Sequence, residues 1–133
     1  MAAPRLHFEI TNQILAAFYE VHRTLGFGFV ESVYSAALER HLVSRGLSAA
    51  REVAVNVRYD GVPIAFQRLD FLVNELVVVE LKATATLLPY AERQLLNYLR
   101  ATNLEVGLLL HFGIKPSFKR VVWFNQPESS ALP

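Results

Sequence analysis

Cysteine is absent from the 133 residues of this chain, which excludes disulfide bonds, iron–sulfur clusters and zinc sites built from thiolates. No apolar run approaches the roughly 20 residues that a membrane-spanning helix needs. The first ten residues, MAAPRLHFEI, contain no apolar signal core, so we expect that the chain is not secreted. These absences predict a cytoplasmic protein that does not enter a membrane.

An excess of charge is also missing. The 13 Lys and Arg residues nearly balance the 12 Asp and Glu residues, which leaves a net charge of +1. A protein that holds a long stretch of nucleic-acid backbone usually has a clear basic surplus. Any contact with nucleic acid should therefore be local, or made together with a protein partner or a second copy of the chain.

The four histidines lack the spacing of a zinc site, and we expect most of them at the surface or in packing contacts. They stand at positions 7, 22, 41 and 111. His22 is kept as a site candidate because it lies one turn before the glycines of residues 26–28.

The apolar residues that are present follow a helical pattern in the first third of the chain. One stripe runs through residues 9–25, and glycines at 26 and 28 interrupt it. A second helix is predicted over residues 30–45, and Gly46 stands where it should stop. The apolar face expected for this second helix consists of Val33, Ala37, Leu38 and Leu42.

Downstream the apolar period changes from helical to alternating, and strands are predicted at residues 53–58, 64–73, 76–82, 106–110 and 119–124. Asp60-Gly61 and Asn74-Glu75 are typical of tight turns. The third strand contains a Leu-Val-Val-Val run without polar alternates, so it should be covered on both faces and central. A helix that begins near Pro89 separates it from the fourth strand, the pattern of a parallel crossover.

These elements predict an α/β fold in the order ααβββαββ, with a mixed sheet of four to five strands flanked by helices. The apolar fraction of 53% is sufficient for one core. We expect a single domain over residues 1–124 and a flexible tail over residues 125–133.

Ionisable residues end the apolar third strand. Glu80 and Lys82 are two positions apart, so they share one face of the strand. Burying such groups is costly unless they are paired or bind a metal. One interpretation is an ion pair between the two at a solvated strand end, and a Glu-x-Lys triplet alone is a weak signal.

Asp70 strengthens a metal-site interpretation, depending on the turn that follows. A three-residue connection over residues 74–76 would pair Val73 with Val77 and place Asp70 opposite Glu80. A strict two-residue turn would pair Asp70 with Val79, and the carboxylates would face apart.

Two adjacent carboxylates need a cation, and oxygen ligands suit Mg²⁺ or Mn²⁺. The backbone carbonyl of Leu81 could supply a further oxygen. Lys82 would then orient the water that attacks a phosphodiester, or help to deprotonate it. We therefore expect Asp70, Glu80 and Lys82 to point into one cleft on one face of the sheet.

Asp70, then Glu80-Leu81-Lys82, then a helix, resembles the core of PD-(D/E)XK nucleases, which have a restriction-endonuclease-like αβββαβ core. Gln94 and Tyr98 on that helix resemble the Gln-x-x-x-Tyr motif of RecB-like and phage-exonuclease-like members. The resemblance implies that Gln94 is catalytic, and that both residues contact a phosphate or the attacking water. The alternative is a half-buried Gln beside an amphipathic Tyr on an ordinary helix.

Gly28, Glu31 and Tyr34 form a Gly-x-x-Glu-x-x-Tyr pattern, which resembles the signature of the GxxExxY family, a branch of the same superfamily. The resemblance covers about residues 21–122. It implies that Glu31 is a third metal ligand and that Tyr34 binds substrate. The alternatives are that Glu31 complements a helix N-terminus and that Tyr34 is a packing residue.

Three positions depart from the family pattern. Leu69 precedes Asp70 where the motif has Pro, Ala91 stands where relatives often carry His, and His111 stands where they often carry Asn. None of these changes touches the carboxylates or Lys82, although substrate contacts could differ. The sequence thus predicts a Mg²⁺- or Mn²⁺-dependent nuclease that hydrolyses phosphodiester bonds of nucleic acid, with DNA favoured. The alternatives are a nuclease-like binding or assembly module without catalytic activity, and a structural ion-pair cluster.

Overall fold

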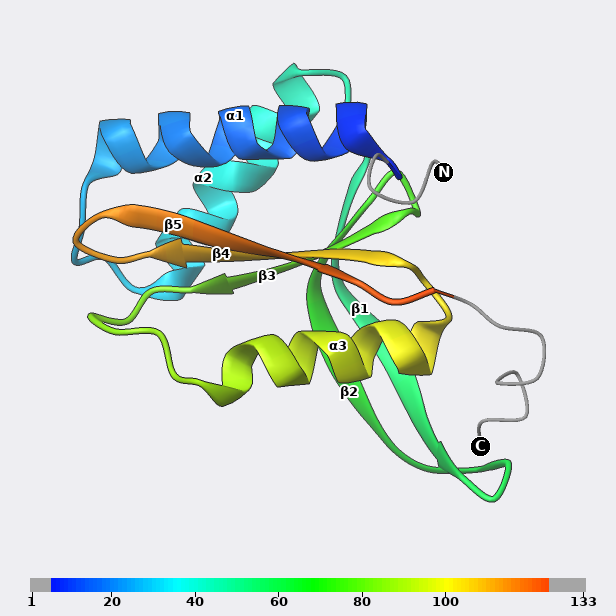
Figure 1. The fold of residues 1–133 in the computed structure, drawn as a ribbon. Helices are drawn as coiled ribbons and strands as arrows, with labels where there is room; N and C mark the ends of the chain where they lie inside the picture. The colour runs from blue at the N-terminus through cyan, green and yellow to red at the C-terminus, as the bar shows by residue number, and fades with distance from the viewer. Residues whose placement is uncertain (1–5, 125–133) are drawn as a thin grey trace.

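The computed structural model of the chain describes residues 6–124. Its elements are α1 (Phe8–Leu25), α2 (Glu31–Ser44), β1 (Ala49–Tyr59), β2 (Val62–Val73), β3 (Val77–Lys82), α3 (Tyr90–Thr102), β4 (Val106–Phe112) and β5 (Pro116–Val122). The predicted order of helices and strands is confirmed. Figure 1 shows the sheet between α1 and α2 on one side and α3 on the other. The tail predicted for residues 125–133 lies outside the described residues.

The five strands form one mixed sheet in the order β1-β2-β3-β4-β5. Neighbours run antiparallel except β3 and β4, which are parallel and joined through α3. The expected parallel crossover is therefore confirmed. The central place predicted for β3 is also confirmed: all of its residues are buried except Lys82, which is half-buried. None of the described helices is long and apolar enough to cross a membrane.

Alternation along β3 divides the core into two layers. Val77, Val79 and Leu81 pack in the cluster that contains the buried residues of α1 and α2. Val78 packs with Leu95 and other residues of α3 on the opposite face. Because side chains alternate along a strand, the even positions at the end of β3 are on the α3 side. Glu80 and Lys82 occupy those positions.

The buried face of α2 differs from the prediction. Val33 was expected in the core, but 36% of it is exposed, and Tyr34 is fully buried instead. The ring of Tyr34 stacks on Phe112 of β4 with 4.3 Å between centroids. An aromatic side chain buries more apolar area than Val, so this contact decides which face of α2 meets the sheet.

The hairpin of β1 and β2 has the turn predicted at Asp60-Gly61, but β1 begins at Ala49, four residues earlier than predicted, and β2 begins at Val62, two residues earlier. Both turn residues have positive φ, 53° and 75°, as a tight hairpin turn requires. Beyond the residues that pair with β3, the hairpin projects from the body of the molecule as an arm (Figure 1). Along the outer part of β2 burial does not alternate, because residues 62–68 are all exposed.

Candidate active site

The turn between β2 and β3 sets the register of the site. Asn74 and Glu75 have positive φ, 52° and 59°, and the N–H of Leu76 donates to the carbonyl of Val73 at 3.0 Å. Val73 nevertheless pairs with Val77, so the connection is three residues long. Of the two registers left open by the sequence, the structure has the one that brings Asp70 opposite Glu80.

The two carboxylates lie where β2 and β3 separate. Ladder pairing between the strands ends at Phe71 and Val79. Beyond it, the N–H of Asp70 donates to Oε2 of Glu80 at 2.8 Å, and the N–H of Leu81 donates to Oδ2 of Asp70 at 2.8 Å. Each carboxylate thus accepts a hydrogen bond from the opposite strand, and both side chains are held in the fork.

Burial dominates the electrostatics of this pair. It raises the pKa of Glu80 to about 8, and the negative charge of Asp70 adds to the effect, while Lys82 opposes it. Burial also raises the pKa of Asp70, against the hydrogen bond from the Leu81 N–H and the charge of Lys82. A hydrogen bond between the two carboxyl groups raises the pKa of Glu80 and lowers that of Asp70. Glu80 therefore holds a proton at neutral pH when no cation is bound.

Lys82 is half-buried at the end of β3. Its positive charge lowers the pKa values of Asp70, Glu80 and Glu31. The ion pairs in the described part of the chain are Arg23–Glu20, Arg51–Glu39 and Lys119–Glu92. The direct Glu80–Lys82 ion pair considered from the sequence is thus not formed, and Lys82 acts on the carboxylates from a greater distance.

Glu31 begins α2 and faces the same region. Partial burial raises its pKa, the charge of Asp70 raises it further, and Lys82 opposes both. Glu31 and Asp70 both line a polar pocket of about 320 Å³. Its other lining residues are Ser32, Ser35, Arg51 and Glu52. Within residues 6–124, no three Asp, Glu or His side chains converge closely enough to form a ready metal site. A ligand role for Glu31 therefore stays a prediction.

Tyr98, on α3, lies within range of the charges of both carboxylates. Only 7% of it is exposed, and burial raises the pKa of its hydroxyl, with further contributions from Glu80 and Asp70. Gln94 lies one turn earlier on the same helix face and is partly buried. The structure thus brings Tyr98 to the pair, and it places Gln94 beside Tyr98 without a hydrogen bond to either acid among the described contacts.

The burial and the hydrogen bonds of Tyr34 do not support the substrate-binding role predicted for it. Its ring is fully buried, its hydroxyl donates to the carbonyl of Gly26, and it accepts from the N–H of Phe29 at 3.3 Å. The hydroxyl is occupied by the loop that leads to Glu31. Tyr34 is therefore a packing residue that fixes this loop, which was the alternative weighed from the sequence.

His111, noted from the sequence only as a departure from the family pattern, is a neighbour of the candidate site. It pairs with Lys82 across the parallel strands, and its Nε2 lies 2.7 Å from the carbonyl of Thr84, just after Lys82. Since β3 and β4 were predicted to be parallel, their common register was the signal that could have placed it. The Nε2 of His22 lies 2.8 Å from the carbonyl of Gly113 in the β4–β5 turn, so its hydrogen-bond partner is this turn.

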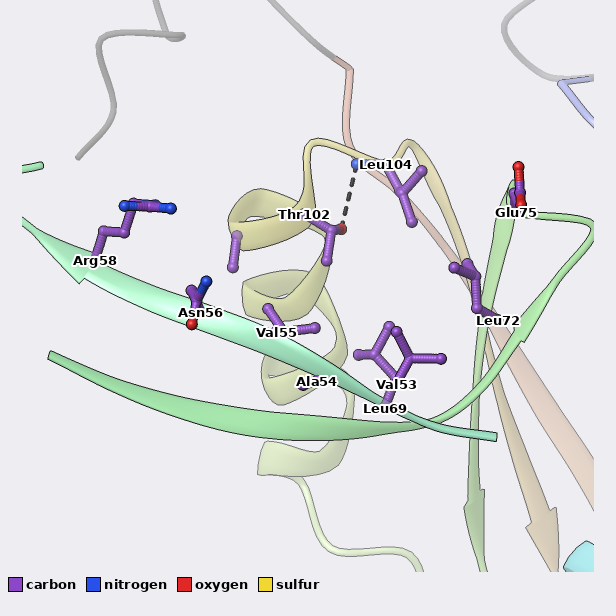
Figure 2. Close-up of a pocket in the computed structure, with 11 residues that line it drawn as sticks. Val53, Ala54, Val55, Asn56, Arg58, Leu69, Leu72, Glu75, Thr102 and Leu104 are labelled. Atoms are coloured by element: carbon purple, nitrogen blue, oxygen red, sulfur yellow. Dashed lines mark hydrogen bonds between the residues drawn. The ribbon is translucent and has the colours of Figure 1, made fainter. Parts of the chain in front are cut away.

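A larger groove of about 360 Å³ lies between β1 and the end of α3 (Figure 2). Its walls are mostly apolar, with Val53, Val55, Leu69, Leu72 and Leu104 among them. Figure 2 shows Arg58 and Glu75 well apart from each other at its margins. None of the predicted site residues lines this groove, so the fork between β2 and β3 is the better candidate for chemistry.

The fork suits a hard divalent cation. Asp70 and Glu80 offer only oxygen donors, and Mg²⁺ is usually bound through one or two carboxylates together with water and substrate phosphates. The raised pKa of Glu80 shows that a positive charge is needed to keep both acids ionised. The donor set therefore fits a metal ion held by the pair, with Lys82 nearby.

Comparisons with known proteins identify the superfamily and the fold. A family model described as the PD-(D/E)XK nuclease superfamily matches residues 8–121. A solved structure titled "Crystal structure of SSO0001" has a TM-score of 0.55 and 18% sequence identity, over 74% of this chain and 52% of that one. The chain thus spans about half the length of that structure, and the likeness shows a shared fold, consistent with a restriction-endonuclease-like sheet and helices. No curated protein matches the sequence.

Proposed function

Since the chain belongs to the PD-(D/E)XK nuclease superfamily, we propose that it is an active, Mg²⁺- or Mn²⁺-dependent nuclease that hydrolyses the phosphodiester bonds of DNA. Gly28, Glu31 and Tyr34 further support a place in its GxxExxY branch. Nucleases of this superfamily generally depend on divalent metals.

The observation that carries the proposal is the pairing of Asp70 with Glu80 in the fork. Burial raises the pKa values of both acids, and the charge of Asp70 raises that of Glu80 further, so placing the two together is unfavourable for stability. Such perturbed groups are concentrated at functional sites. Here they coincide with the acidic positions of the nuclease motif, and Lys82 follows two residues later.

Each residue has a role that follows from its position. Asp70, Glu80 and the carbonyl of Leu81 would hold the cation, and Glu31 would approach from α2. The cation, when bound, would supply Lewis-acid activation and neutralise charge on the phosphate. Lys82 would orient the attacking water through Nζ or take part in its deprotonation.

Two residues of α3 would act on the substrate side. The charges of both carboxylates act on the Tyr98 hydroxyl, which would therefore be suited to donate to a phosphate oxygen held near them. Gln94 shares its helix face and would position the attacking water or a phosphate. Since the net charge is only +1, we expect a small contact with DNA, or help from a protein partner or a second copy of the chain.

The proposal is tested by cleavage of labelled DNA with the purified full chain in Mg²⁺, Mn²⁺ and EDTA. Glu80→Gln and Asp70→Asn preserve an acceptor for the backbone N–H groups but remove the charge, so both should abolish metal-dependent cleavage. Glu75→Gln, on the exposed turn, is the matched control and should cleave normally. Cleavage that persists in EDTA or in Glu80→Gln would show that another site or a contaminant is responsible.

The second candidate is a nuclease-like binding or assembly module without activity. The nearly balanced charge of the chain favours it, because a nuclease acting alone must hold its own substrate. It predicts that metal binds to the fork and that no cleavage occurs under any condition.

A further inference from the structure

Three connections lie at the same end of the molecule, beyond the carboxyl end of β3 (Figure 1). They are the α1–α2 loop (residues 26–30), the β3–α3 loop (residues 83–89) and the β4–β5 turn (residues 113–115). The first contains Val30, which precedes Glu31, and the second begins directly after Lys82. The candidate active site and these connections are therefore continuous along the chain.

Hydrogen bonds from buried or half-buried side chains fix all three connections. Tyr34 holds the first through Gly26 and Phe29. His111 contacts the carbonyl of Thr84 in the second, and His22 contacts the carbonyl of Gly113 in the third. What these connections expose is thus held in place by the fold.

They expose large apolar side chains rather than polar ones. We call these residues the rim: Phe27, Phe29, Val30, Leu88, Tyr90 and Ile114, all between 45% and 69% exposed. Tyr90 is the first residue of α3, directly after the second connection. The ring of Phe29 is additionally fixed edge-on against Tyr34, with 6.1 Å between centroids. Apolar side chains gathered at one end of a protein in this way mark a binding surface.

Charge indicates what this surface binds. The three connections read GFGFV, ATATLLP and GIK, so they contain no acidic residue and one lysine, although the chain has 12 Asp and Glu residues. The connections themselves therefore add no negative charge beside the rim, and the nearest acidic residues along the chain are Glu31, directly after Val30, and Glu92, two residues after Tyr90. The same connections carry too few positive charges to grip a duplex, whose binding depends on neutralised phosphates.

We propose that the rim is a stacking platform for unpaired bases, so that the strand delivered to the fork is single-stranded nucleic acid. Aromatic rings bind single strands because every base has a flat face to stack on, and this requires fewer phosphate contacts. The inference rests on the proposed nuclease function only for what happens to the strand after it binds.

Fluorescence anisotropy in EDTA tests binding separately from cleavage. The probe is a fluorescein-labelled oligothymidylate of roughly 12 nucleotides, alone or annealed to its complement. The single strand should bind about tenfold more tightly than the duplex. Tyr90→Ser and Phe27→Ser should each weaken single-strand binding by about fivefold or more, the scale of one lost stacking contact.

Tyr59→Ser is the matched control, because Tyr59 is 66% exposed on the arm and Tyr90 is 63% exposed on the rim. It should bind both probes as the unaltered protein does, and melting curves should show that all three variants fold. Equal affinity for single strand and duplex would overturn the proposal. So would rim variants that bind like the control, the result expected if the rim serves a protein partner.

Cleavage assays with Mn²⁺ distinguish this proposal from the nuclease proposal. Rim-dependent binding without any cleavage would support the platform and contradict the nuclease. Cleavage that is unchanged in Tyr90→Ser and Phe27→Ser, on both strand types, would support the nuclease and contradict the platform.

Discussion

Asp70 and Glu80 exchange hydrogen bonds with each other's strands: the N–H of Asp70 donates to Glu80, and the N–H of Leu81, next to Glu80, donates to Asp70, both at 2.8 Å. The side chains that would bind a cation therefore also close the fork between β2 and β3. Each carboxylate has a second oxygen besides the one used in these bonds. Cation binding and strand contact consequently depend on the same two residues.

Stability should depend on pH through Glu80. Its pKa is raised to about 8 in the folded protein, whereas the ordinary value is 4.5, so the folded state keeps a proton that the unfolded chain has released in this window. The free energy of unfolding should therefore fall as pH rises from about 5 to about 8. The side chain of Glu80→Gln cannot ionise. Near pH 8 the free energy of unfolding of this variant should therefore be higher than that of the unaltered protein by at least about 1 kcal/mol, the free energy of one pKa unit.

Urea unfolding without metal, at both ends of this pH window, measures the difference. Glu75→Gln removes an exposed acid from the nearby turn and should follow the unaltered protein. Parallel pH curves for Glu80→Gln and the unaltered chain would show that Glu80 ionises normally.

Metal binding should release a proton. Because Glu80 is protonated at neutral pH, a cation must displace that proton. As long as the pH is below the Glu80 pKa, the apparent affinity for the cation should therefore increase about tenfold with each unit by which the pH is raised. Mn²⁺ or Mg²⁺ should raise the melting temperature of the unaltered protein but not that of Glu80→Gln. Calorimetry in two buffers of different ionisation enthalpy counts the protons, and binding at neutral pH without proton release would contradict the assignment.

Lys82→Ala should separate catalysis from metal binding. It leaves both acids intact but removes the group that orients or activates the water, so cleavage should fall by about 100-fold or more. Metal stabilisation should persist or increase, because a nearby positive charge is gone. Glu80→Ala should lose both properties, and Lys119→Ala, at an exposed position paired with Glu92, should lose neither. Full activity in Lys82→Ala would exclude the proposed role.

Tyr34→Phe tests the loop contact. It preserves the stacking on Phe112 but removes the hydroxyl that bonds Gly26 and Phe29. We expect a loss of about 1 kcal/mol in stability and faster hydrogen exchange at the Phe29 amide. Tyr59→Phe on the exposed arm should change neither quantity. An unchanged exchange rate at Phe29 would mean that the loop is held by other contacts.

The arrangement of elements was predictable because it depends on local patterns. The glycines after α1, the apolar run of β3 and the crossover to β4 each have one straightforward interpretation, and the structure confirms all three. The motif positions of Asp70, Glu80 and Lys82 were equally clear. Their mutual register was not, because Asn74 and Glu75 are compatible with either turn length.

Other features depended on partners that periodicity does not reveal. Val33 and Tyr34 are both apolar neighbours on α2, and only the position of Phe112 on β4 decides which is buried. His111 entered the site for a similar reason, since its place next to Lys82 follows from strand alignment. Long-range packing, which local sequence does not specify, determined these positions.

The length of the three-residue connection at 74–76 makes the candidate site unusually sensitive to insertions and deletions in this turn. Surface turns ordinarily tolerate the gain or loss of a residue, since little packs against them. Here the N–H of Asn74 donates to the carbonyl of Ser48, and its side-chain Oδ1 accepts from the N–H of Ser48. The number of residues in the turn decides which side of the sheet each acid occupies. A single deletion in this turn would leave every candidate site residue in the chain, yet turn Asp70 away from Glu80. The identity of these residues is therefore insufficient to judge whether a related sequence can form the same acid pair, and the length of this turn must be counted as well.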